Sequence, residues 1–281
     1  MSKTNGRTHE YHAEATVLEG HLRLPLAQEI KRQAHVKLPD YGGYLAQRAQ
    51  NYHLESVISF RSAYTQVAGN LDVKPDKGWS TLATSVVEGL NVLDVLTADR
   101  VVGQMTTEHP LKGYVPSISF LGTRFENLRI AGHPVEFDMA LDIVGPRPDD
   151  DLSYTADPGF LCRVAEQCAT GRQSPNLQQD VEEDYNRLAP TPGNPAEVEC
   201  SLVNRASGGY PGLSFGHIIH IPHFGWITLA KLRLTYEEIK QGEDILKTTT
   251  FHLTMIDLKL GCPIEGSTGV GTLSTNGKSK P

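Results

Sequence analysis

The segment FLGTRFENLRIAGHPVEFDMALDIV, residues 120–144, shows the clearest strand pattern in the chain. In its second half, apolar side chains occupy every second position. Because the side chains of a strand point alternately to opposite faces, this pattern predicts a strand with one face on a core and the other in water. The core face would hold Val135, Phe137, Met139, Leu141 and Ile143.

A short connection precedes this strand. Residues 131–134, AGHP, separate the apolar positions of residues 125–130 from those of residues 135–143. A glycine-containing link of this length folds two strands into an antiparallel hairpin. Strand-like sequence also occurs at residues 11–17 and 54–67, so the chain is predicted to be mainly β.

Length and composition are those of a globular protein. The chain has 281 residues, 39% of them hydrophobic and 21% charged, so it can bury a large core in one β domain or two. No pair of cysteines has the CxxC spacing of a zinc site, and four are too few for a disulfide scaffold of this size. We therefore expect reduced thiols at Cys162, Cys168, Cys200 and Cys262.

Charge and hydropathy exclude two classes of partner. A net charge of -7 argues against nucleic acid, which is bound by basic surfaces. No run of apolar residues approaches the ~20 that a membrane-spanning helix needs, and the N-terminus lacks the apolar region of a signal peptide. The cytoplasm is therefore the default location, with export by a route without a cleaved signal as the alternative.

Two parts of the first half permit more than one assignment. Residues 26–52 show helical spacing of apolar side chains on both sides of Pro39, which predicts two short helices. Residues 80–98 fit either a helix or strands. Their many Val and Thr residues lose rotamer freedom in a helix, which favours strands with a turn near Glu88-Gly89.

The composition changes at residues 145–197, where frequent prolines exclude a long strand and leave room for two helices. Asp157 as N-cap and Pro158 at the first helical position predict the start of one helix, and Gly171 its end. The second helix would carry Val181 on its apolar face.

We predict a mainly β fold, with antiparallel sheets in a sandwich or barrel-like arrangement and a small helical insertion. Residues 1–144 would form a β-rich part, residues 145–197 the Pro-rich helical insertion, and residues 198–281 a second β-rich part packed with the first as one unit. In residues 245–260 the apolar positions switch from odd to even numbers, as at a β-bulge or in a strand that changes sheets.

Residues 210–226 combine histidines, aromatic residues, glycines and prolines. Within one strand, residues 213–221, the histidines at 217 and 220 would point to opposite faces, so we expect no metal site. A structural corner, with Pro222 ending one strand and Gly225 bending the chain into the strand 224–234, explains the same residues. If the segment instead binds a ligand by stacking and hydrogen bonding, its contacts would be Tyr210, His217, His220, His223, Phe224 and Trp226.

No stretch carries a catalytic or cofactor signature. The glycine-rich segments lack the lysine of a phosphate loop, and no GxSxG motif is present. We therefore expect no cofactor and a non-catalytic β-rich protein that is structural, self-assembles or binds through its surface, as a homo-oligomer. The alternative is a carrier of a small-molecule ligand, or an enzyme, with a barrel-like cavity near residues 210–226.

Two stretches resemble a known group of proteins. Residues 83–102, which contain VVEGLNVLDVLTADRVV, and residues 120–135, which contain GTRFENLRIAGHPV, are similar in pattern to the secreted bacterial choice-of-anchor proteins, which are β-rich and of uncertain function. The resemblance implies a β-rich architecture with a non-catalytic role. The sequence departs from that group in having no signal peptide or anchoring tail, so secretion is not carried over, and no site residues are.

Overall fold

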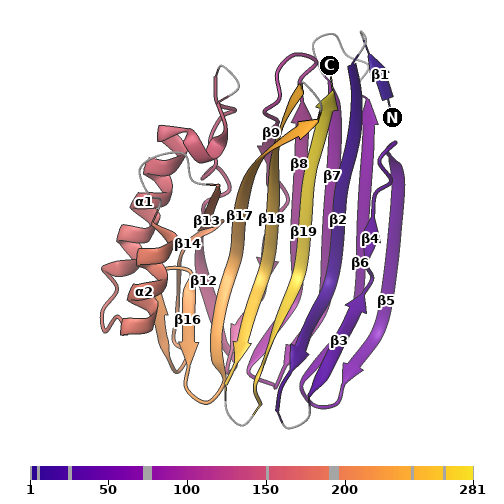
Figure 1. Cartoon of the computed structure of the whole chain (residues 1–281). Helices are drawn as coiled ribbons and strands as arrows, with labels where there is room; N and C mark the ends of the chain where they lie inside the picture. The colour runs from indigo at the N-terminus through magenta and orange to yellow at the C-terminus, as the bar shows by residue number, and fades with distance from the viewer. Residues whose placement is uncertain are drawn as a thin grey trace.

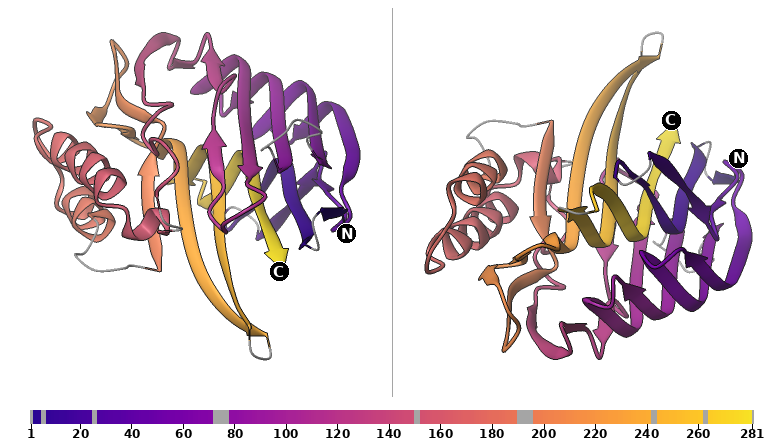
Figure 2. Two further views of the ribbon diagram at one scale, coloured as in Figure 1. Left: turned by 90° about the horizontal axis from the view of Figure 1, so that it is seen from above. Right: turned by 90° about the horizontal axis from the view of Figure 1, so that it is seen from below.

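In the computed structural model, two antiparallel sheets pack face to face as a sandwich with two helices at one side (Figures 1 and 2). The structure describes residues 2–4, 7–24, 27–71, 78–149, 152–189, 196–241, 244–261 and 264–280. The predicted mainly β sandwich with a helical insertion is confirmed. The strands of the described residues form open sheets rather than a closed barrel.

The first sheet, sheet A, combines both ends of the chain, because its central long strands β2 and β19 are neighbours. It runs in the order β1-β2-β19-β18-β17-β16-β15, with β3 and β4 paired to β2 and β13 paired to β17. Its members are β1 (Ser2–Thr4), β2 (Arg7–Leu22), β3 (Gln28–Gln33), β4 (Val36–Lys37), β13 (Glu197–Ser201), β15 (Leu213–Phe215), β16 (Ile218–Ile221), β17 (Gly225–Gln241), β18 (Asp244–Leu260) and β19 (Gly266–Lys280).

The second sheet, sheet B, runs in the order β14-β12-β11-β8-β7-β6-β5, with β9 and β10 paired to β8. Since β1–β4 lie in sheet A and β14 lies in sheet B, the sequence segments before and after the insertion are interleaved in one sandwich. Its members are β5 (Gly43–Leu54), β6 (Ile58–Leu71), β7 (Trp79–Val92), β8 (Leu96–His109), β9 (Ser117–Ser119), β10 (Arg124–Glu126), β11 (Arg129–Ile130), β12 (His133–Met139) and β14 (Val203–Gly208).

The two helices predicted within residues 26–52 are wrong, because this stretch forms β3, β4 and β5. Its helical spacing was weak, and pairing with β2 and β6 decides the conformation instead. Leu26, part of that spacing, lies outside the described residues. The cysteines at 162, 168 and 200 are free thiols, as expected, whereas Cys262 lies outside the described residues.

The strands predicted within residues 80–98 are confirmed, but their turn lies at residues 93–95 rather than at Glu88-Gly89. Leu93 and Asp94 both have positive φ, the geometry of the tight turns that suit a twisted hairpin. The Asn91 side chain accepts a hydrogen bond from the Asp94 backbone N–H at 2.9 Å and stabilises this turn.

The hairpin predicted around residues 131–134 is confirmed, since β11 and β12 pair across Ala131 and Gly132, which both have positive φ. Its second strand is shorter than predicted. β12 ends at Met139, because the chain turns at residues 141–144. The side chain of Phe137 is consequently only half-buried, with its ring 5.2 Å from that of Phe125.

The predicted switch of apolar positions in β18 is also confirmed, and it extends across sheet A. At one level of the sheet lie Ala230, Met255, Gly271 and Val17, which we call the switch row. All four residues are buried, and so is the row beside it, Leu229, Ile256, Val270 and Leu18. Two successive rows therefore face the core, where regular alternation would turn one of them outward.

Neither predicted explanation of the switch is right: no residue is inserted in any strand, so it is not a bulge, and β18 stays between β17 and β19 in sheet A, so the strand does not change sheets. β17 and β18 keep the same register on both sides, from Leu229↔Ile256 to Lys231↔Thr254. The change of face is absorbed by positive φ values at Ala230 and Gly271. As a result, the buried face of β17 passes from odd to even positions, and Trp226 and Thr228 are only half-buried.

The helical insertion contains η1 (Tyr154–Ala156), α1 (Pro158–Arg172) and α2 (Gln179–Leu188). As predicted, the Asp157 carboxylate caps α1 by accepting a hydrogen bond from the Phe160 N–H at 2.7 Å. The helix ends one residue beyond the predicted stop at Gly171. None of the described helices is long and apolar enough to cross a membrane.

Candidate functional site

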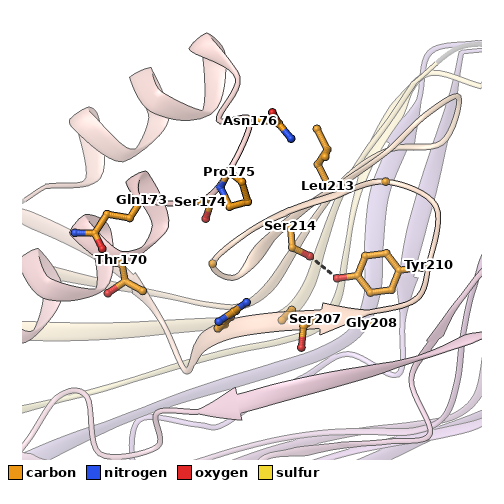
Figure 3. A pocket seen from close by; sticks show the side chains of 14 residues that line it. Thr170, Gln173, Ser174, Pro175, Asn176, Ser207, Gly208, Tyr210, Leu213 and Ser214 are labelled. Carbon is orange, nitrogen blue, oxygen red and sulfur yellow. Dashed lines mark hydrogen bonds between the residues drawn. The ribbon is translucent and has the colours of Figure 1, made fainter.

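A pocket of about 460 Å³ lies where the helical insertion meets the β14–β15 segment (Figure 3). One wall comes from the end of α1 and the loop to α2, residues 170–176, and the other from residues 205–208 of β14 and 210–216 around β15. This volume is within the usual range for sites of small molecules. The pocket therefore joins three segments that are distant in the sequence.

Small residues bring these segments together. A Cβ atom at Gly171 would lie 2.3 Å from Cζ of Tyr185, and one at Gly216 would lie 2.8 Å from the hydroxyl of the same tyrosine. The absence of side chains at both glycines lets α1, the buried ring of Tyr185 and the β15–β16 turn approach closely. The Tyr185 hydroxyl then donates a 2.6 Å hydrogen bond to the Phe215 carbonyl.

A second set of hydrogen bonds fixes α1 against the strands. The Gln167 side chain is buried, its Nε2 donates to the Ser201 carbonyl and its Oε1 accepts from the Ser201 N–H, both at 2.9 Å. This pairing imitates a strand ladder and satisfies the backbone N–H and carbonyl of Ser201, the last residue of β13. The pocket is therefore built on rigid elements.

The lining of the pocket is polar and nearly free of charge. Hydroxyl and amide side chains dominate, and the hydroxyls of Tyr210 and Ser214 form a hydrogen bond with each other (Figure 3). Burial raises the pKa of Tyr210, so its hydroxyl stays protonated at neutral pH. Arg205 is the one charged side chain among the described lining residues.

This lining does not support acid–base or nucleophilic catalysis. Among the described lining residues there is no Asp, Glu, His or Cys. The serine hydroxyls therefore have no base within the pocket to activate them, which such catalysis needs. The arrangement can bind a small polar molecule through hydroxyls, amides and one guanidinium.

Of the six ligand-binding residues considered from the sequence, Tyr210 lines this pocket and the others lie elsewhere. Residues 213–221 form the hairpin β15–β16 rather than one strand, because the chain turns at Gly216-His217. His217 is thereby buried, with its ring edge against Tyr185 at 5.8 Å. Burial, and secondarily Lys231, lower the pKa of His217 to about 4.

The remaining four residues occupy the next corner. His220 is half-buried and stacks on Trp226, with ring centroids 4.3 Å apart. His223 is exposed in the turn at residues 222–224, where it has a positive φ, and Phe224 is buried below it. The three histidines do not converge, and among the described residues no group of three or more His, Cys, Asp or Glu side chains could hold a metal ion.

Most pocket residues were missed from the sequence. Arg205, Gln173 and Asn176 belong to no motif and lie on a strand and a loop that meet only in the folded chain. The one usable signal was the loop 207–212, SGGYPG, which contains Tyr210.

A second candidate feature is the free edge of sheet B at β5. This strand of twelve residues ends the sheet opposite the helices and, among the described strands, pairs only with β6 (Figure 1). Nine of its residues are exposed, which is unusual because a sheet strand normally buries one face. Leu45 and Tyr44, on opposite faces, are 42% and 64% exposed.

The comparisons with known proteins identify a family without assigning an activity. No curated protein and no solved structure matches the chain. A family model described as "Domain of unknown function (DUF8256)" matches residues 9–235, which include β2 to most of β17, the helical insertion and the whole pocket. The chain therefore belongs to the family of the domain of unknown function DUF8256.

Proposed function

We propose that the protein is a non-catalytic β-sandwich that works by self-assembly, with two copies paired through β5. The observation that carries this proposal is the exposure of residues 43–48, the first half of β5, on both faces of the strand. Leu45 stands opposite Val67, which is fully buried, so at the level of this pair the core ends one strand before the edge of the sheet. A partner that covers β5 would bury Leu45 and extend that core.

The composition of β5 supports pairing. Natural edge strands are commonly blunted by charged residues or proline, which prevent unwanted association. Residues 41–54, YGGYLAQRAQNYHL, contain no acidic residue and no proline, and Arg48 is the single lysine or arginine. In a chain with a net charge of -7, this is a strand that can approach its own copy without repulsion between carboxylates.

Symmetry favours a closed pair. Two antiparallel β5 strands can be related by a twofold axis, so that the same surface is used on both copies and the assembly closes. A strand of twelve residues offers a shared edge of roughly 40 Å at 3.4 Å per residue. The opposite side of the sandwich carries the helices, which oppose growth into a filament (Figure 1).

The first prediction concerns this edge. Leu45→Lys places a charge in the proposed interface, where it loses water on association, and should raise the dissociation midpoint of the dimer at least about tenfold, or ~1.4 kcal/mol. Size-exclusion chromatography with light scattering over a concentration series measures this. The matched control is Leu121→Lys, since Leu121 is 73% exposed and lies outside β5.

Two results would contradict self-assembly through β5. One is a wild-type protein that stays monomeric at every concentration tested. The other is a dimer that responds equally to Leu45→Lys and Leu121→Lys, because the interface would then lie elsewhere.

A second function, carriage of a small polar anion, is favoured by one observation. Arg205 faces a pocket whose described lining contains no acid, and its guanidinium has no ion pair in the part of the chain that the structure describes. A carboxylate or phosphate could pair with it while the hydroxyls and amides fix its orientation.

The second prediction tests this carriage. Native mass spectrometry of freshly purified protein should show a bound small anion that Arg205→Gln loses, because the variant keeps hydrogen-bonding capacity but removes the charge. Arg61→Gln, at an exposed position of β6 away from the pocket, is the control and should keep it. Identical spectra for all three proteins would exclude this second function.

A further inference from the structure

The outer face of sheet A is hollowed beside the switch row. Along a regular strand, side chains on one face are two residues apart, or about 7 Å. Where two successive rows turn inward, the next outward residues are three apart, or about 10 Å. Thr254 and Asp257 on β18, and Gly269 and Thr272 on β19, flank this gap. The result is a trough of about 400 Å³ that runs across the strands.

The trough is lined only by polar, charged or glycine residues among those described. Its floor is shaped by Thr254, Thr272 and Gly269. A Cβ atom at Gly269 would come within 3.1 Å of the Thr272 hydroxyl and 3.4 Å of the Thr254 methyl, so the missing side chain keeps the floor deep. The hydroxyl, carboxylate and cationic groups of this lining suit a hydroxylated ligand.

The two carboxylates in the trough are held in place by cations. Asp257 lies 3.6 Å from Lys231, which also pairs with Glu199 at 3.2 Å. Glu19 pairs with Arg32 at 3.0 Å. Fixed carboxylates of this kind accept hydrogen bonds from ligand hydroxyls, and among the described lining residues their two negative charges are matched by the positive charges of Lys231 and Arg233.

Donors without partners complete the lining. Arg233 is exposed, and its guanidinium makes no ion pair or hydrogen bond with any described residue. The hydroxyls of Thr254 and Thr272 likewise form no hydrogen bond with a described residue. His252 lies beside Arg233 in the ladder. Burial lowers the pKa of His252 to about 4, and Arg233 and His12 add to this, so the ring is neutral and can donate and accept.

We infer that this trough binds a saccharide that carries a carboxylate, of the uronic acid class. Arg233 pairs with the carboxylate, and the threonine hydroxyls, Asp257 and Glu19 bond the ring hydroxyls. The volume accommodates one or two sugar rings, and such a ligand uses both the free guanidinium and the free hydroxyls. A simple carboxylate would use only the guanidinium, and a neutral sugar would use only the hydroxyls.

The backbone that creates the trough is itself strained. Ala230 adopts a positive φ of 44°, a region that L-residues other than Asn and Asp rarely enter. Such strain is typical of sites where a particular shape is required. Gly271, at the same level, reaches positive φ without that cost.

Titration of the full chain with sodium D-glucuronate, followed by ¹H–¹⁵N correlation spectra, tests the inference. We expect saturable shifts centred on β18 and β19, with a Kd at least about tenfold lower than for D-glucose or sodium acetate. Arg233→Gln should weaken glucuronate binding about tenfold. Gly269→Val, which fills the trough with a residue suited to a strand, should abolish it. Arg61→Gln on sheet B is the control and should change nothing.

Three outcomes would overturn the inference: no saturable shifts with glucuronate, equal affinity for glucuronate and acetate, or unchanged binding in folded Gly269→Val. The result is independent of the self-assembly through β5. Light scattering of Gly269→Val should match the wild type, and Leu45→Lys should still bind glucuronate.

Discussion

Acidification from pH 7 to pH 4 should destabilise the protein by several kcal/mol, because two histidines are buried in the neutral form. Burial lowers the pKa of His9 to about 4, and burial with the nearby Lys231 lowers that of His217 to about 4. The ordinary value is 6.5. At 1.36 kcal/mol per pKa unit, each histidine can contribute roughly 3 kcal/mol.

The sign of this change in stability follows from the pH at which the unfolded and the native states bind protons. The unfolded chain protonates its histidines below pH 6.5, whereas the native protein does so only near pH 4. Stability from these two groups is therefore complete above about pH 6.5, falls as the pH decreases to about 4, and changes no further below that. His252 adds to the same trend, to a smaller extent because it is partly exposed.

Urea unfolding at a series of pH values measures this effect. Between pH 6 and pH 4.5 the slope of the unfolding free energy should correspond to about two to three protons bound on unfolding, from His9, His217 and in part His252. His217→Gln should reduce it by about one proton, and His223→Gln, at an exposed turn, should leave it unchanged. A wild-type stability that is flat over this range would show that the buried rings are protonated or solvated in the native state.

The strands with one buried face could be predicted from the sequence, whereas the edge strand β5 could not. Alternation revealed β2, β6 and the β11–β12 hairpin, because each buries one face. The first half of β5 buries neither face, so Tyr44, Leu45 and Arg48 followed no period of two and their spacing was mistaken for a helix. A free edge therefore removes the signal on which a strand prediction depends.

The trough shows a different limit. The switch at Met255-Ile256 was visible in one strand, but the trough exists because Ala230, Gly271 and Val17 lie at the same level. That alignment is a property of register between strands distant in the sequence, which no single strand encodes. The pocket is similar, because Arg205 meets the end of α1 only after the insertion has docked.

Docking of the insertion itself should depend most on Tyr154. This residue is fully buried between α1 and sheet A, with its ring against Phe160 at 6.3 Å and against Phe251 of β18 at 5.6 Å. Its hydroxyl donates to the Pro116 carbonyl at 3.0 Å. Tyr154→Ala should therefore cost about 3–5 kcal/mol through lost burial and the cavity left behind.

Two further variants serve as comparisons. One measures the contribution of the Tyr154 hydroxyl apart from that of its ring, and the other measures the loss of a tyrosine that is not buried. Tyr154→Phe keeps the ring contacts and removes one buried hydrogen bond, so it should cost about 1–2 kcal/mol in urea unfolding. Tyr41→Ala removes a tyrosine that is 68% exposed and should cost under ~0.5 kcal/mol.

Because the ring of Tyr154 joins the insertion to sheet A, hydrogen exchange of the α1 amides should also accelerate in Tyr154→Ala and hardly change in Tyr154→Phe and Tyr41→Ala. If Tyr154→Ala lost no more stability than Tyr154→Phe, the ring contacts with Phe160 and Phe251 would not hold the insertion, and Gln167 and Tyr185 would have to hold it instead.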